Sequence, residues 1–116
     1  MNSTYKVNLS ERAQDSIREI VYYISRELLA RDAALNLAEV LRDAVLSLGD
    51  LPKRIRLLPD EPWQSMGIRR LQTKNYYIYF IVDDNKLEVN ILDIIYNKRE
   101  QERILREISK GSQLYD

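Results

Sequence analysis

The feature that most constrains the fold is an aromatic and β-branched run at residues 75–82, which carries no charge. Aromatic and β-branched side chains favour strands, and a short uncharged run of this kind fits a strand that is buried on both sides. The polar sequence Asp83-Asp84-Asn85-Lys86 follows at once and predicts a tight turn. We therefore expect residues 75–82 to form a central strand packed on both faces.

Three other segments combine β-forming residues with an apolar pattern that fits strands: residues 5–9, 67–72 and 87–96. The last two lie on either side of the central run and are joined to it by short polar turns. Short turns connect antiparallel neighbours, so these three strands are predicted to form a meander. The first strand is separated from the others by a long segment, and we expect it to add at a sheet edge.

Apolar residues recur at helical spacing in the segment between the first strand and the meander. Ser10 is expected to cap a first helix that runs to about Leu29, and Asp32 to cap a second helix that Gly49 ends. Two amphipathic helices joined by a short polar turn form an antiparallel αα-hairpin. A final helix is predicted at residues 100–109.

The element order β-α-α-β-β-β-α predicts an α+β fold, in which an N-terminal αα-hairpin packs on one face of an antiparallel sheet. The segment at residues 50–64 holds all three prolines and is expected to be a structured loop with one helical turn. At 116 residues the chain is expected to be a single domain, residues 1–116, with residues 110–116 as a flexible tail.

Composition narrows the function classes. The 18 Lys and Arg residues balance the 18 Asp and Glu residues, so no overall field attracts the chain to nucleic acid or to a membrane surface. The chain has no cysteine and no histidine, which removes disulfides, the commonest general base and the commonest metal ligand. We expect a cytoplasmic protein with no membrane segment, no metal and no cofactor.

Several motifs in a fixed order carry a resemblance to a known family; they lie at residues 5–10, 23–24, 61–71, 75–80 and 94–100. With them the chain resembles the RelE/ParE-family toxins of type II toxin–antitoxin systems, also called the plasmid-stabilisation family. The resemblance spans nearly the whole chain. It implies a compact antiparallel sheet, an αα-hairpin and a small antitoxin that wraps the toxin with an otherwise disordered segment.

Two activities compete within that family. RelE-like members enter the ribosome and cleave mRNA, whereas ParE-like members poison DNA gyrase. The resemblance places Arg99 at the position of a catalytic arginine of RelE-like nucleases, and Arg70 at a lysine position. Tyr77 stands where an arginine is expected, and Leu105 stands where a tyrosine is expected. RNA cleavage also needs a proton acceptor, so we predict ParE-like inhibition of gyrase, with an mRNA endonuclease as the alternative.

The candidate functional cluster is basic and consists of Arg70, Lys98 and Arg99. These cations could stabilise a charged transition state or bind an acidic partner. The alternative is that these three residues are ordinary solvated surface residues without a functional role. A third alternative for the whole chain is an inactive family member that acts only as an interaction module.

The candidate partner surface comprises Tyr22, Arg26 and Leu29, because the apolar stripe of the first helix widens there beyond what one core face needs. Arg69 is a further candidate partner contact, since neighbouring residues of a strand face opposite sides. Alternatively, Tyr22 packs against the second helix. The solvent exposure of the Tyr22 side chain decides between the two. Expected partners are an antitoxin and either gyrase or the ribosome with its mRNA; a toxin–antitoxin hetero-oligomer is an assembly that the resemblance allows.

Overall fold

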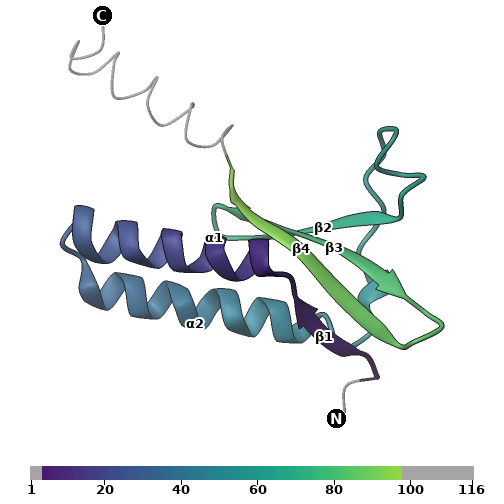
Figure 1. Cartoon of the computed structure of the whole chain (residues 1–116), viewed down its shortest axis with the longest axis horizontal. Helices are drawn as coiled ribbons and strands as arrows, with labels where there is room; N and C mark the ends of the chain where they lie inside the picture. The colour runs from purple at the N-terminus through teal and green to yellow at the C-terminus, as the bar shows by residue number, and fades with distance from the viewer. Residues whose placement is uncertain (1–3, 98–116) are drawn as a thin grey trace, which may run out of the picture.

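A helical hairpin lies against one face of a four-stranded sheet in the computed structural model, which describes residues 4–97 (Figure 1). The elements are β1 (Lys6–Leu9), α1 (Glu11–Tyr22), a π-helical turn (Tyr23–Glu27), α2 (Arg31–Ser47), a 3₁₀ turn (Pro52–Arg54), β2 (Ile68–Thr73), β3 (Tyr76–Asp83) and β4 (Glu88–Tyr96). The predicted α+β class and the αα-hairpin are confirmed. The predicted helix at residues 100–109 and the tail at 110–116 lie outside the described residues.

The sheet is mixed, with strand order β1-β4-β3-β2. β2, β3 and β4 form the predicted antiparallel meander, and β1 lies at the predicted edge. The prediction of a wholly antiparallel sheet is wrong for β1, which runs parallel to β4. Two further hydrogen bonds flank this pairing: the Lys6 amide donates to the Leu87 carbonyl at 2.9 Å, and the Ser10 amide donates to the Ile91 carbonyl at 3.0 Å. Short turns dictate direction only between consecutive strands, and here the hairpin and two strands intervene.

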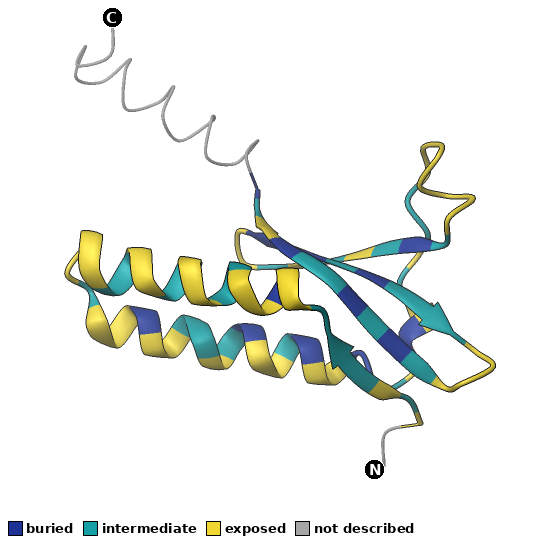
Figure 2. Cartoon of the chain, viewed as in Figure 1, coloured by how far each residue is buried: buried dark blue, intermediate teal, exposed yellow. Residues whose placement is uncertain are grey.

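The core lies between the hairpin and one face of the sheet, as the buried bands in Figure 2 show. Ile78, Phe80 and Ile91 are completely buried there. β3 is central as predicted, but the alternate residues on its other face, Tyr77 and Tyr79, are only half-buried. The expectation of full packing on both faces is therefore wrong, because in residues 4–97 both long helices pack on the same side of the sheet.

The two helices begin differently from one another. The Ser10 hydroxyl accepts a hydrogen bond from the Ala13 amide at 3.0 Å, so the predicted cap of α1 is confirmed. The predicted cap of α2 is wrong: Ala30 occupies that position without a side-chain bond, and Asp32 lies in the first turn. A carboxylate there still favours the positive end of the helix dipole. The helical path of α1 continues through the π-helical turn and reaches Leu29 with a left-handed φ of 51°.

The connector, residues 48–67, leads from α2 to the outer edge of β2. Gly49 follows the last residues of α2 as predicted, and its carbonyl accepts the Tyr5 amide at 2.9 Å. The 3₁₀ turn supplies the helical turn expected among the prolines. Leu57 then forms a bridge with Arg69, and the Leu58 amide donates to the Ile68 carbonyl at 2.9 Å. The connector thereby covers the first part of the outer edge of β2.

Candidate functional site

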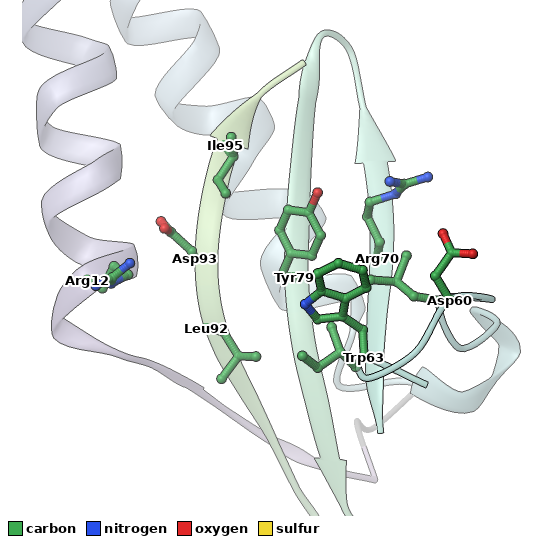
Figure 3. Close-up of a pocket in the computed structure, with 10 residues that line it drawn as sticks. Arg12, Asp60, Trp63, Arg70, Tyr79, Leu92, Asp93 and Ile95 are labelled. Atoms are coloured by element: carbon green, nitrogen blue, oxygen red, sulfur yellow. The ribbon is translucent and has the colours of Figure 1, made fainter. Parts of the chain in front are cut away.

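A cavity of about 560 Å³ lies on the sheet face that the helices leave open (Figure 3). Its lining comes from all three meander strands, from α1 and from the connector: Arg12, Leu58, Asp60, Trp63, Ile68, Arg70, Tyr79, Leu92, Asp93 and Ile95. We call it the sheet-face cavity. Its walls combine aromatic and aliphatic surface with two arginines and two carboxylates, so it is suited to bind a ligand with both apolar and charged groups.

Arg70 is the predicted functional residue that the structure places at this cavity. It lies on β2 directly opposite Tyr79 of β3, and its guanidinium carbon lies 4.2 Å from the centroid of the Tyr77 ring. Tyr77 in turn makes an edge-to-face contact with Tyr79, with ring centroids 6.2 Å apart. A cation–π contact of this kind uses none of the N–H donors of the guanidinium. Arg70 is therefore held in position while its donors remain available for an anion.

A β-bulge shapes the β4 side of the sheet-face cavity. Tyr79 pairs with Asp93 whereas Phe80 pairs with Ile91, so Leu92 is the extra residue. The Asp93 carboxylate accepts the Ser16 hydroxyl at 2.6 Å and its Oδ1 also accepts the Ile94 amide at 2.7 Å. The bulge is thereby fastened to α1 through Oδ1 of Asp93, a residue that also lines the cavity.

The other predicted members of the basic cluster, Lys98 and Arg99, lie outside the described residues. They follow Asn97, which comes directly after β4, and their part in the site stays a prediction. Within residues 4–97, no group of three His, Cys, Asp or Glu side chains is arranged to hold a metal ion.

Arg69 has a structural task that is visible in the structure. It alternates with Arg70 along β2, and its guanidinium donates to the Ile55 carbonyl at 2.6 Å. This bond holds the connector against β2. Its predicted contact with a partner stays a prediction.

The predicted partner surface on the hairpin is exposed. Tyr22 is 59% exposed and Leu29 is 86% exposed, which excludes the packing of Tyr22 against α2. The Arg26 guanidinium carbon lies 5.5 Å from the Tyr22 ring centroid. Tyr22 and Arg26 line a shallow apolar groove of about 590 Å³ along α1, together with Ile17 and Val21. A tyrosine and an arginine beside an apolar groove are typical of interface anchors.

A polar network ties the N-terminal strand to the far end of the sheet. The Tyr5 hydroxyl donates to one oxygen of Asp84 at 2.7 Å, and the Lys53 ammonium binds the other at 3.0 Å. The hydrogen bond from Tyr5, followed by that from Lys53, lowers the pKa of the Asp84 carboxyl. Its bond to Asp84 raises the pKa of the Tyr5 hydroxyl, and the carboxylate likewise raises the pKa of Lys53. The network joins β1, the connector and the β3–β4 turn on the exterior.

Sequence reasoning missed several residues of these surfaces. Arg12 and Asp60 line the sheet-face cavity, and Arg54 and Arg56 lie in the connector beside Arg70. The sequence offered no spacing signal for Arg54 and Arg56, because Arg54 ends the 3₁₀ turn and the two residues do not share an extended segment.

Comparison with family models finds a match over residues 7–111 to the ParE toxin of the type II toxin–antitoxin system parDE. The chain belongs to this ParE toxin family. The match begins within β1, covers the remaining described elements and extends beyond them, in agreement with the resemblance noted from the motifs. A comparison with curated proteins finds no match.

Solved structures support the same fold. The chromosomal ParDE system of Pseudomonas aeruginosa aligns with a TM-score of 0.64 and 19% identity, over 82% of this chain and 98% of that chain. The RelBE2 toxin–antitoxin complex of Mycobacterium tuberculosis aligns with a TM-score of 0.61 and 16% identity, over 80% and 98%. A mutant of the Escherichia coli toxin RelE in the free state aligns with a TM-score of 0.55 and 15% identity, over 84% of this chain and 88% of that chain. At these identities the likeness establishes the fold.

In the part of the chain that the structure describes, neither α1 nor α2 has the length and apolar character that a membrane-spanning helix needs.

Proposed function

We propose that this ParE-family toxin arrests growth by inhibiting DNA gyrase and that a cognate antitoxin neutralises it. The observation that carries the proposal is the stacked Arg70 in the sheet-face cavity. A cation held on an aromatic ring at the rim of a partly apolar cavity is suited to recognise a protein surface or to hold an anion.

The arrangement favours binding over proton transfer. Cleavage of RNA by its own 2′-hydroxyl needs a group that accepts a proton and one that returns it. The chain has no histidine; of the two carboxylates of the cavity, Asp93 is bonded to Ser16 and Asp60 lies exposed in the connector. Tyr77 occupies the place of an expected arginine and serves as the platform for Arg70. These features support a toxin that acts by occupying its target.

Ribosome-dependent cleavage of mRNA is the second candidate function. The aromatic groups around Arg70 favour it, because Tyr79 and the 47% exposed Trp63 could stack on bases. The position of Arg99 after the last strand is the other supporting feature. In this case the arginines would stabilise the charge on the phosphate rather than anchor a protein.

Induced expression in bacteria separates the two candidates. In induced cells we expect growth arrest. In vitro, addition of the purified toxin to purified gyrase should abolish the supercoiling activity of gyrase. Primer extension on cellular mRNA after induction should show no cuts placed by the reading frame. Codon-positioned cuts with normal supercoiling would overturn the proposal in favour of the endonuclease, and no arrest would favour an inert interaction module.

An antitoxin partner is supported by the similar structures, because two of them are toxin–antitoxin systems solved as RelBE2 and ParDE. We propose that the antitoxin contacts the hairpin surface of Tyr22, Arg26 and Leu29. Leu29 is 86% exposed, and its φ of 51° lies in the left-handed region. A leucine pays about 1–2 kcal/mol for that conformation and here gains little burial within the chain. A contact outside the chain would explain such a side chain.

Replacing Leu29 with asparagine tests this surface. Asparagine tolerates the left-handed region, so thermal stability should be unchanged or slightly raised. Affinity for the cognate antitoxin should fall about tenfold, because one leucine contact of roughly 1.5 kcal/mol is lost. Titration calorimetry with the purified antitoxin measures the change.

Leu51→Asn is the matched control, since Leu51 is also left-handed, with φ 47°, and 67% exposed, but lies in the connector. Antitoxin affinities that are equal for Leu29→Asn and the wild type would remove Leu29 from the interface.

A further inference from the structure

A second cavity, of about 580 Å³, lies between the connector and the outer edge of β2. Its lining residues are Arg54, Ile55, Arg56, Leu57, Leu58, Pro59, Gln64 and Arg70. We call it the edge cavity. Three of these residues are arginines and, among the described residues, none of the lining side chains is a carboxylate. Its electrostatic character is therefore basic although the chain as a whole is neutral.

The three arginines are available to different degrees. The Arg54 guanidinium donates to the carbonyls of Asp50 and Leu51 at 2.6 and 3.1 Å, which fixes its position. Arg70 is fixed by its stack on Tyr77. Arg56 is exposed, and neither of the ion pairs formed within residues 4–97 includes any of the three. Two fixed guanidiniums and one adaptable guanidinium around one cavity can together bind a carboxylate or a phosphate.

The surroundings distinguish between these anions. Apart from Gln64, the rest of the cavity wall is aliphatic, from Ile55, Leu57, Leu58 and Pro59, and it contains no aromatic ring on which a base could stack. A neutral net charge also gives no general attraction for a phosphate backbone. Aliphatic side chains that alternate with carboxylates in an extended peptide match such a wall better than a nucleic acid does.

The backbone beside the edge cavity is open to an added strand. β2 is the last strand of the sheet. The connector reaches its outer side at Ile68, through hydrogen bonds with Leu58 and Trp63, and at Arg69, through the bridge with Leu57. From Arg70 to Thr73, no described strand pairs with its outer side. An unpaired strand edge accepts an extended peptide through main-chain hydrogen bonds, while flanking pockets select its side chains.

We infer that the edge cavity binds an extended peptide segment that alternates acidic and aliphatic residues and that adds to β2. The inference rests on the proposed function, since the antitoxin is the partner expected to supply this segment. Arg56 and Arg54 bind its carboxylates, and Arg70 joins the edge cavity to the sheet-face cavity. One acidic segment thereby engages Arg70 and covers the functional cation.

The test uses the purified full chain and a fluorescently labelled peptide of alternating Glu and Leu. We expect Arg56→Gln to weaken binding about tenfold, the loss of one charge-assisted contact. Arg42→Gln is the matched control, because Arg42 is also exposed but lies on α2. The Arg42→Gln protein should bind the peptide with the same affinity as the wild type. A peptide with Gln in place of Glu should bind weakly to all three proteins.

Three outcomes would overturn the inference: equal affinity of wild type and Arg56→Gln, equal affinity for the Glu and Gln peptides, or tighter binding of a single-stranded oligothymidine than of the Glu peptide. The last would assign the cavity to nucleic acid. Failure of the proposed function is measured separately, because a chain that causes no growth arrest can still be titrated with the peptide.

Discussion

Replacing Arg70 with alanine is expected to abolish growth arrest in a protein that remains folded. Arg70 is exposed, and its recorded contact within the chain is the stack on Tyr77, so its loss should change the free energy of unfolding by about 1 kcal/mol or less. If Arg70 is a hot spot of the interface, its truncation costs about 2 kcal/mol or more, which corresponds to roughly a thirtyfold loss of target affinity. Survival of induced cells and inhibition of gyrase supercoiling measure the effect, and circular dichroism checks the fold.

Two further variants sharpen this result. Arg70→Lys keeps the charge but loses the planar fork and its stack on the tyrosine, so we expect it to be nearly as inactive. Arg42→Ala, on the outside of α2, should remain fully toxic. A folded Arg70→Ala protein with wild-type toxicity would remove Arg70 from the site. Arg99→Ala, tested in the same way, decides whether the predicted cluster extends to that residue.

The fold was accessible from sequence wherever neighbouring residues decide the structure. The central strand followed from its uncharged aromatic run, and the start of α1 followed from Ser10, whose cap involves a residue three positions away. The parallel pairing of β1 with β4 was not accessible, because it joins residues more than eighty positions apart, such as Lys6 and Glu88. No local pattern distinguishes the two directions of an edge strand.

The site shows the same division. Arg70 could be proposed from its place on a strand before an aromatic run, but its support by Tyr77 depends on the register of β2 on β3. The edge cavity depends on the path of the connector, which the Arg69 side chain holds through the Ile55 carbonyl. No sequence pattern relates Arg54, which ends the 3₁₀ turn, to Arg56, and only the folded chain brings both beside Arg70.

The one-sided core leads to the prediction with the largest effect on stability, which is for Phe80→Ala. Phe80 is completely buried between β3 and the hairpin. Its truncation should lower the free energy of unfolding by about 3–5 kcal/mol, from the lost burial and the cavity that remains. A small domain has only about 5–15 kcal/mol in total, so much of the protein should be unfolded at growth temperature. Urea denaturation followed by circular dichroism measures the change.

Ile95→Ala on the opposite face of the sheet is the control, because Ile95 is 41% exposed and no helix among residues 4–97 covers that face. We expect a loss of about 1 kcal/mol or less there. If both substitutions were equally costly in the full chain, a further layer would have to cover the open face, and the sheet-face cavity with Arg70 would be closed to a target. A large difference between them means that this face carries little of the stability and is free to serve binding.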